Sequence, residues 1–149
     1  MSEMIHVVCP ACGGVNRMPR EKLGDRGRCG RCRAPLFSGR PATLTSGTFD
    51  VHVGRSGVPV LVDFWAPWCA PCRAMAPVFE KAAAELEPAL RLARVDTDAE
   101  QGLAARFGIQ GIPTLVLFDR GREVARISGA MNLEGLVDWV RAQSMPGRP

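Results

Sequence analysis

The six cysteines of this 149-residue chain are the residues whose spacing most directly suggests chemistry. They form three Cys-x-x-Cys pairs, Cys9/Cys12, Cys29/Cys32 and Cys69/Cys72. Such pairs serve either as thiolate ligands of a metal ion or as a dithiol that cycles with a disulfide. The first two pairs lie in a segment rich in glycine and arginine, whereas the third follows a strongly apolar run. These surroundings predict metal binding for the first two pairs and redox chemistry for the third.

A spacer of sixteen residues separates the first two pairs, which is within the range for a four-cysteine zinc site. Two Cys-x-x-Cys turns can close one tetrahedron of sulfurs, and glycines after or between the cysteines let backbone amides turn toward them. Two local disulfides, or four free thiols, are the alternative, but such short loops gain little stability from closure. Short strand-like stretches at residues 5–8 and 15–18 fit a zinc ribbon. The expected ligands of Zn²⁺ are Cys9, Cys12, Cys29 and Cys32.

The composition also indicates how the chain divides. A unit of about 40 residues buries too little apolar surface to fold without a metal or disulfides, and the four cysteines supply that support. Residues 39–46 are rich in small and turn-forming side chains and predict a linker. The expected organisation is a zinc-binding amino-terminal module (residues 1–38), the linker (39–46), a larger domain (47–143) and a disordered tail (144–149).

The larger domain shows strands and helices in alternation. A near-continuous apolar run predicts a buried strand, and Pro77 should kink the helix that follows it. A turn at residues 119–121 joins two further strands as a hairpin. The expected strands cover residues 58–66, 90–95, 114–118 and 123–127, and the expected helices cover residues 72–87, 100–107 and 133–143. This order predicts an α/β fold in which helices flank a central mixed sheet.

The net charge of +4 is concentrated in the amino-terminal part. Residues 1–40 hold eight Lys or Arg against three acids, a net charge of +5, and the remainder carries −1. A basic patch can bind nucleic acid, but four thiolates on a divalent metal would lower the excess by about two charges. The arginines are scattered and not interleaved with aromatic residues. We therefore interpret them as a solvated surface and do not expect nucleic-acid binding.

The first residues include an early acid and no basic start, so they do not resemble a signal peptide. The longest apolar run, around residues 58–62, is far shorter than the roughly 20 residues that a membrane-spanning helix requires. We therefore expect a cytoplasmic protein without membrane contact. Because thiols are kept reduced in that compartment, closely spaced cysteines there are metal ligands or redox catalysts rather than structural disulfides.

The segment from Trp65 to Cys72, Trp-Ala-Pro-Trp-Cys-Ala-Pro-Cys, closely resembles the active-site motif of the thioredoxin family. The resemblance extends over roughly residues 44–143 and includes motifs at 96–98, 107–114, 118–121 and 128–129. With the four-cysteine segment in front, the chain is similar to the bacterial thioredoxin 2 subgroup, which carries an amino-terminal zinc-binding extension. The resemblance implies the thioredoxin fold and a thiol-disulfide oxidoreductase that reduces protein disulfides.

The expected position of the third pair explains its reactivity. Cys69 should lie at the turn from the strand into the helix, where unpaired N–H groups and the helix dipole favour a thiolate. We interpret Cys69 as an exposed nucleophile that attacks a substrate disulfide, and the more buried Cys72 as the thiol that resolves the mixed disulfide. Pro71 suits the first helical turn. A second zinc site is the alternative, but no partner pair remains for it.

Asp63 interrupts a strand that should be buried on both faces, and burial raises the pKa of a carboxyl group. The resemblance implies that this acid lies beneath the cysteine pair and takes the proton of Cys72 through water. A strand-end acid turned to solvent is the alternative. In the family a lysine usually neighbours this acid. The matching residue here is Arg94, which holds a charge but does not release a proton at neutral pH.

Pro113 precedes an expected strand, which favours a cis bond between Ile112 and Pro113, and the resemblance implies the same bond. In the family this proline faces the cysteine pair and leaves the backbone beside it free to pair with an extended substrate. The usual glycine after the first cysteine is alanine here, which predicts a small change in redox equilibrium. The expected docking surface for substrates is mostly apolar and comprises Trp68, Ala70, Pro71, Ile112, Gly129 and Ala130.

The resulting hypothesis is a protein-disulfide reductase whose zinc module is structural or responds to oxidants. The family implies an NADPH-dependent thioredoxin reductase that recharges the pair, and proteins with disulfides as substrates. We expect no tightly bound organic cofactor and a monomer. One alternative is a zinc-ribbon adaptor that binds a protein or nucleic acid and carries a fused thioredoxin fold. The other is a disulfide-forming oxidant, although such proteins usually have a basic or histidine residue between the cysteines.

Overall fold

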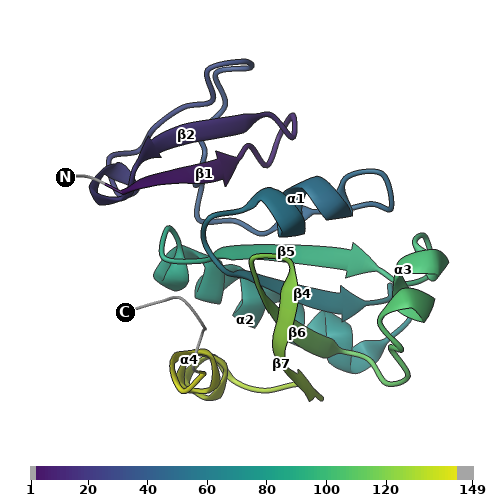
Figure 1. Ribbon diagram of the computed structural model, residues 1–149. Helices are drawn as coiled ribbons and strands as arrows, with labels where there is room; N and C mark the ends of the chain where they lie inside the picture. The colour runs from purple at the N-terminus through teal and green to yellow at the C-terminus, as the bar shows by residue number, and fades with distance from the viewer. Residues whose placement is uncertain (1–2, 144–149) are drawn as a thin grey trace.

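The computed structural model describes residues 3–143, which form a two-stranded hairpin followed by an α/β unit (Figure 1). The amino-terminal module begins with β1 (Met4–Val8), β2 (Val15–Pro19) and the 3-10 turn η1 (Arg20–Lys22). The elements that follow are β3 (Ala42–Thr43), α1 (Phe49–Arg55), β4 (Val60–Trp65), α2 (Ala70–Leu86), β5 (Arg91–Asp96), α3 (Gln101–Arg106), β6 (Thr114–Asp119), β7 (Arg122–Ser128) and α4 (Leu133–Arg141).

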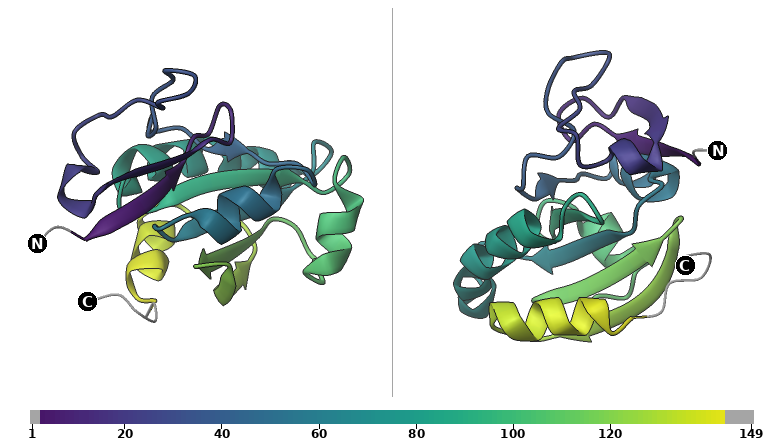
Figure 2. Two further views of the ribbon diagram at one scale, coloured as in Figure 1. Left: turned by 45° about the horizontal axis from the view of Figure 1, so that its top comes forward. Right: turned by 90° about the vertical axis from the view of Figure 1, so that its left-hand side faces the viewer.

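Five strands form one mixed sheet in the order β3-β5-β4-β6-β7. Strands β3, β5 and β4 run parallel, whereas β6 pairs antiparallel with both β4 and β7. Figure 2 shows helices on both sides of this sheet. The expected α/β fold with a mixed sheet is confirmed, and the two expected ribbon strands pair as an antiparallel hairpin.

The central strand β4 supplies both halves of the core. Every residue of β4 before Trp65 is buried, because neighbouring strands cover its edges and helices cover its faces. Leu61 packs in one core with Phe79 of α2, and α4 belongs to the same core. Val62 packs on the other face in a core that includes Phe49 of α1. Residues of β4 therefore alternate between the α2 side and the α1 side of the sheet.

The structure differs from the expected organisation at the start of the larger domain. Part of the expected linker, residues 39–46, is strand β3, which pairs with β5. Ala42 in this strand and Leu44 just after it are buried. Helix α1 is absent from the sequence-based expectation, because its seven residues offer only a short apolar pattern with Phe49 and Val53. Burial of these side chains against the sheet gives both segments their structure.

The other elements lie close to their expected positions. Helix α2 begins at Ala70, two residues before the expected start, and it contains Pro77. The expected disordered tail, residues 144–149, lies outside the described residues. Within residues 3–143, no helix combines the length and the apolar character needed to span a bilayer.

The amino-terminal module packs directly on the larger domain, with β1 beside α1 in Figure 1. Ile5 and Leu36 of the module are buried in one cluster with Val58, which leads into β4. The backbone N–H of Gly57 donates a hydrogen bond to the carbonyl of His6 at 2.8 Å. A Cβ atom on Gly57 would lie only 2.7 Å from Cγ1 of Ile5. Glycine at this position therefore permits the close approach of the two parts.

Arg91 provides a buried cation at this junction. It begins β5, is 3% exposed, and donates from Nη2 to the carbonyls of Val8 at 3.0 Å and Leu36 at 2.7 Å. Its Nη1 lies 3.6 Å from the carboxylate of Glu87, and its guanidinium carbon lies 4.3 Å from the centre of the Phe37 ring. A buried charge needs such partners to offset its loss of hydration. Arg91 therefore joins the module to the sheet.

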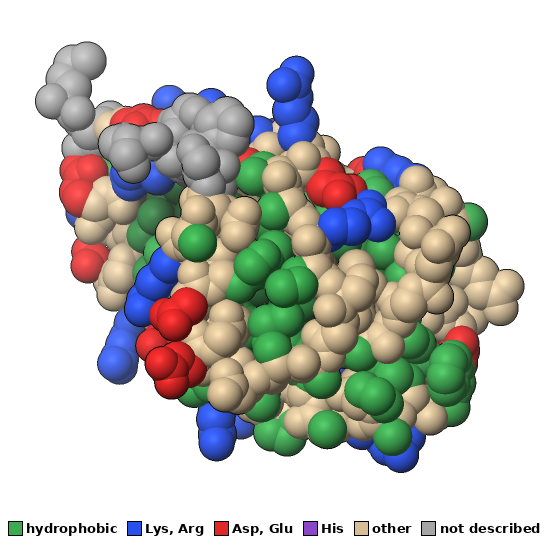
Figure 3. All heavy atoms as spheres, turned by 90° about the horizontal axis from the view of Figure 1, so that it is seen from below, with side chains coloured by type: hydrophobic (Ala, Val, Ile, Leu, Met, Phe, Trp, Pro, Cys, Tyr) green, Lys and Arg blue, Asp and Glu red, His purple; other side chains and the backbone are tan. Residues whose placement is uncertain are grey.

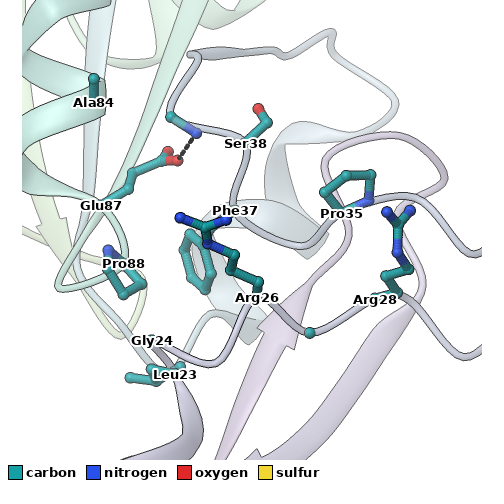
Figure 4. Close-up of a pocket in the computed structure, with 12 residues that line it drawn as sticks. Leu23, Gly24, Arg26, Arg28, Pro35, Phe37, Ser38, Ala84, Glu87 and Pro88 are labelled. Atoms are coloured by element: carbon teal, nitrogen blue, oxygen red, sulfur yellow. Dashed lines mark hydrogen bonds between the residues drawn. The ribbon is translucent and has the colours of Figure 1, made fainter.

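A pocket of about 620 Å³ lies where the module meets the end of α2. Figure 4 shows Arg26 and Phe37 on the module side and Glu87 and Pro88 on the other side. The dashed line in Figure 4 is the hydrogen bond from the N–H of Gly39 to Oε1 of Glu87, at 3.1 Å. None of the six cysteines lines this pocket, so it is separate from both cysteine sites.

We expect Arg91→Met to lower the free energy of unfolding by about 3 to 5 kcal/mol, because Glu87 and two carbonyl groups lose a buried partner. Urea denaturation at pH 7 measures this loss. The double variant Arg91→Met/Glu87→Gln removes the unpaired carboxylate as well and should be destabilised less than the single variant. A loss below about 1 kcal/mol in Arg91→Met would show that the junction does not depend on this ion.

Candidate functional site

The third cysteine pair is joined as a disulfide at the amino end of α2, and the two Cα atoms lie 5.2 Å apart. Cys69 is the N-cap residue of α2, and its Sγ accepts a hydrogen bond from the backbone N–H of Cys72 at 3.2 Å. Pro71 lies in the first turn, where the N–H group that proline lacks has no helical partner. In the reduced pair, the Cys72 N–H and the helix dipole favour a thiolate on Cys69.

Cys69 is less accessible than the expected exposed nucleophile. The exposed fraction is 4% for Cys69 and 0% for Cys72, so Cys72 is the more buried residue of the pair. Cys69 packs with Ala66 and Ile112, and its Sγ lies 3.8 Å from the carbonyl oxygen of Ile112. Ile112, in the loop before β6, therefore packs against Cys69, and little of Cys69 faces solvent.

The loop that contains Ile112 is bonded to the residue after β7. The peptide bond between Ile112 and Pro113 is cis. The N–H of Gly129 donates a hydrogen bond to the carbonyl of Pro113 at 2.9 Å. The loop that contains Ile112 and contacts Cys69 is therefore linked through Pro113 to Gly129, just after β7.

Most of the residues expected to dock substrates are exposed. Among the described residues, Trp68 is the most exposed large apolar side chain, with an exposed fraction of 68%. Figure 3 shows one face of the molecule, on which hydrophobic side chains gather in the middle and at the lower right. Of the six expected docking residues, Ile112 is half-buried and the exposed ones are Trp68, Ala70, Pro71, Gly129 and Ala130.

Asp63 lies in β4 and has no exposed surface. It shares a face of the strand with Leu61, so it points to the side of the sheet that α2 covers. Neither carboxylate oxygen has a hydrogen-bond partner among the described residues. Burial raises the pKa of Asp63 to about 6, although Arg94 opposes this shift. Asp63 is therefore a buried acid and does not face solvent.

Arg94 of β5 is the register partner of Asp63 on the adjacent strand β4. Its Nε lies 3.6 Å from Oδ2 of Asp63, an ion pair too long for a hydrogen bond. Its guanidinium carbon lies 4.1 Å from the centre of the Trp65 ring, and its side chain is 23% exposed. Because a guanidinium keeps its proton at neutral pH, Arg94 favours the ionised carboxylate without acting as a proton donor.

The four free cysteines of the amino-terminal module converge on one point. Their Sγ atoms all lie within 4.8 Å of one another. A tetrahedral zinc ion with Zn–S bonds of about 2.3 Å requires sulfurs roughly 3.8 Å apart. The distances are 3.6 Å between Cys9 and Cys32 and 3.7 Å between Cys12 and Cys29. These four residues therefore fit zinc, which they would hold as thiolates.

The two cysteine turns repeat one backbone pattern. The carbonyl of Cys9 accepts a hydrogen bond from the N–H of Gly13, and the carbonyl of Cys29 accepts one from the N–H of Arg33, both at 2.9 Å. Both donor residues are left-handed, with φ of 76° at Gly13 and 70° at Arg33. The first turn therefore has a glycine at its left-handed position, as expected, and the second turn does not. In the second turn an arginine adopts this conformation at a cost of about 1 kcal/mol.

Backbone N–H groups point toward the sulfurs, as the turns predict. The N–H of Ala11 lies 3.4 Å from Sγ of Cys9, that of Gly14 lies 3.3 Å from Sγ of Cys12, and that of Arg31 lies 3.4 Å from Sγ of Cys29. The pKa of Cys29 is lowered to about 6. The largest cause is the hydrogen bond from the N–H of Cys32, and the next is the hydrogen bond from the side chain of Asn16. Burial raises the pKa of Cys9 to about 11. Binding of zinc would make all four ligands thiolates.

Two polar residues of these sites are absent from the sequence-based expectations. The sequence could have indicated a buried role for Arg91, because this residue stands between two leucines at the start of a buried strand. A lone cation there needs a partner. Asn16 is the second, and its side chain bonds to the second cysteine turn. No local pattern distinguishes Asn16 from an ordinary strand residue.

Comparisons with known proteins cover both parts of the chain. A family model described as Thioredoxin matches residues 40–142, and one described as Thioredoxin 2, N-terminal, matches residues 8–34. The chain is 42% identical to Thioredoxin C-3 of Corynebacterium nephridii over 137 residues, which cover 92% of this chain and 94% of that protein. It is 46% identical to Thioredoxin 1 of Nostoc over 90 residues, which cover 60% of this chain and 84% of that protein.

We expect Asp63→Asn to stabilise the oxidised protein at pH 8 by about 2 to 3 kcal/mol, because ionisation of this buried carboxyl costs free energy. The pKa is about 6 in the folded chain against an ordinary value of 3.8, so the folded state binds this proton more tightly than the unfolded chain. The contribution of the group to stability is therefore complete below about pH 4 and is lost as the pH rises through about 6.

Urea denaturation of both proteins at pH 4 and at pH 8 tests this expectation, and the two should differ little at pH 4. Asp50→Asn is the matched control, because Asp50 is exposed and its loss should change stability little at either pH. An equal gain for Asp63→Asn at both pH values would contradict the raised pKa.

Proposed function

This chain belongs to the thioredoxin family, and we propose that it reduces disulfide bonds of other proteins by dithiol-disulfide exchange at Cys69 and Cys72. The observation that carries the proposal is the pair at the amino end of α2, with the buried Asp63 on the same side of the sheet. The N–H of Cys72, which donates to Sγ of Cys69, and a carboxyl group with a raised pKa suit the two halves of this exchange.

In the first half, Cys69 acts as the nucleophile. Its thiolate attacks one sulfur of a substrate disulfide, and the substrate S–S bond breaks as the new bond to Cys69 forms. The departing sulfur leaves as a thiolate and takes a proton from solvent. The N–H of Cys72, 3.2 Å from Sγ of Cys69, supports this proposal because it favours the attacking thiolate.

In the second half, Cys72 resolves the mixed disulfide. Asp63 accepts the proton of Cys72 through water, and the Cys72 thiolate attacks Sγ of Cys69. The bond between Cys69 and the substrate breaks, and the second substrate sulfur leaves as a thiolate that takes a proton from solvent. The substrate has then gained two electrons and two protons, and the pair has become the disulfide present in this structure. Arg94 supports the step by favouring the ionised form of Asp63 before the transfer.

Substrate chains would dock on the apolar edge around Trp68 and Ile112. An extended segment could pair with the backbone beside Pro113. Pro113 itself has no N–H and so takes no part as a donor. Support comes from the partial exposure of Ile112 and from Gly129, which is exposed and bonds to the carbonyl of Pro113. This arrangement suits flexible or unfolded segments better than a rigid partner surface, because the contact is apolar and backbone-mediated.

The proposal includes a partner and a compartment. An NADPH-dependent thioredoxin reductase would return the pair to the dithiol, and the cytoplasm would keep the four free cysteines reduced. The alternative of a disulfide-forming oxidant is less favoured, because Ala70 and Pro71 between the cysteines provide no side chain that could donate to the thiolate. The adaptor alternative is less favoured, because it gives no role to the buried Asp63 on the side of the sheet that α2 covers.

For the amino-terminal module we propose a structural metal ion. Cys9 and Cys29 are buried in the cluster that contains Ile5 and Leu36, so the metal would hold the segments that pack on the larger domain. A redox-responsive role is the second candidate. It is favoured by Cys32, which is exposed and is the thiolate that an oxidant would reach first.

If the metal is structural, zinc should stay bound until the protein unfolds. Heating the zinc-loaded protein with a metallochromic dye should release zinc at the temperature at which circular dichroism reports unfolding. Removal of zinc by a chelator should lower the midpoint by at least about 5 °C. Release of zinc during a peroxide titration, with the fold of the larger domain intact, would instead support the redox-responsive role.

Cys72→Ser should trap substrates on Cys69, because the mixed disulfide forms but is not resolved. Covalent complexes from a cell extract should appear on non-reducing gels and disappear with a reductant. Turnover of a disulfide substrate with NADPH and thioredoxin reductase should fall by at least about a hundredfold. Cys69→Ser is the matched control and should trap nothing. An empty trap beside an active wild-type protein would overturn the proposed role of Cys69.

A further inference from the structure

Asn16 of β2 bonds to both cysteine turns of the amino-terminal module. Its Oδ1 accepts a hydrogen bond from the N–H of Gly30 at 2.9 Å, inside the second turn. Its Nδ2 lies 3.5 Å from Sγ of Cys29 in the same turn and 3.3 Å from the carbonyl of Gly14, which ends the first turn. The same nitrogen lies 3.5 Å from the carbonyl of Val7 in β1. One amide group therefore touches β1 and both turns.

The position of Asn16 can hold the two cysteine turns in a fixed arrangement. The two turns lie sixteen residues apart in sequence, and a tetrahedral ion requires their sulfurs in one fixed arrangement. A side chain that bonds to both turns holds the second turn at the correct distance from the first. Asparagine suits this task because its amide offers two N–H donors and one carbonyl acceptor on a short stem.

The contact with Cys29 also has an electronic consequence. Hydrogen bonds from N–H groups to a thiolate stabilise its charge, and bonds to a charged acceptor are stronger than neutral ones. Asn16 and the backbone N–H of Arg31 both donate to Sγ of Cys29. Partners of this kind, outside the ligands themselves, orient metal ligands, and their loss typically weakens metal affinity by about tenfold to a hundredfold.

We propose that Asn16 is a positioning residue of the metal centre, which joins the two cysteine turns and donates to the Cys29 sulfur so that the bound ion is retained. This inference rests on the proposed zinc site at the four cysteines. It assigns to Asn16 a task beyond completing the hairpin, since a purely structural side chain would change the stability of the hairpin without changing the sulfur that binds the metal.

Two substitutions separate these tasks. Asn16→Leu keeps the approximate size of the side chain and removes all of its hydrogen bonds. Asn16→Asp keeps an oxygen that can accept from Gly30 but removes the N–H donor to Cys29. Val15→Thr is the matched control, because Val15 is an exposed neighbour in the same strand. All proteins carry Cys69→Ser and Cys72→Ser, so that the dithiol binds no metal.

The first measurement is the release of zinc from each full-length protein to an excess of chelator, followed with a metallochromic dye at 25 °C. We expect release at least about tenfold faster than in the background protein for Asn16→Leu and Asn16→Asp. Val15→Thr should release zinc within about twofold of the background protein. Equal rates for all four proteins would overturn the proposal.

The second measurement is the absorption spectrum after Co²⁺ replaces zinc. Loss of the N–H donor makes the Cys29 thiolate a better electron donor, so the sulfur-to-cobalt charge-transfer band of Asn16→Asp should move to lower energy. An unchanged spectrum in Asn16→Asp would overturn the proposed contact with the sulfur, even if Asn16→Leu fails to fold. If the background protein itself binds no zinc, the proposed metal site fails and this inference fails with it. Normal zinc binding with unaffected variants overturns the inference alone.

Discussion

Complete burial of the central strand β4 is the constraint on which the dithiol site depends. Strands β5 and β6 cover its two edges, and helices cover its faces, so Asp63 has no contact with solvent. The lack of hydration raises the pKa of this carboxyl, which makes it a stronger base than a hydrated aspartate. The same strand ends at Trp65 and leads within four residues to Cys69 at the start of α2. One strand thus positions both the acid and the disulfide.

Strand β5 connects this site to the metal-binding part of the molecule. Arg91 and Arg94 lie three residues apart, so they point to opposite faces of the sheet. Arg91 donates to carbonyl groups of the amino-terminal module, and Arg94 lies beside Asp63. Each guanidinium has partners that offset the loss of hydration, but the partners differ. The same strand therefore provides a structural contact through Arg91 and, through Arg94, a charge that lowers the pKa of Asp63.

The three Cys-x-x-Cys pairs show how one spacing serves two kinds of chemistry. In each pair a backbone N–H group donates to the first sulfur, because the turn geometry directs it there. In the amino-terminal module, Cys9 and Cys29 lie on tight turns that bring four sulfurs to one point. Cys69 instead caps a helix of seventeen residues and is joined to Cys72 as a disulfide. The number of sulfurs brought together separates metal binding from disulfide exchange.

Local patterns in the sequence were sufficient for much of this picture. The spacing of the cysteines indicated the four-sulfur cluster, alternating strands and helices indicated the mixed sheet, and an acid inside an apolar run indicated the burial of Asp63. These features are encoded within windows of a few to about twenty residues, in which periodicity and turn chemistry are visible. The short elements β3 and α1 carry too little pattern of their own and owe their structure to packing on the sheet.

Only the tertiary structure decided which residues far apart in the chain meet. Arg91 bonds to Val8, 83 positions earlier, and Cys69 is covered by Ile112, 43 positions later. Asn16 acquires its contact with Cys29 only when the hairpin brings the second turn beside β2. The sequence by itself determined which residues can act as ligands, nucleophile and acid, because those capacities are chemical. Packing decided their partners and burial, because hydrogen bonds and desolvation depend on neighbours that no local pattern specifies.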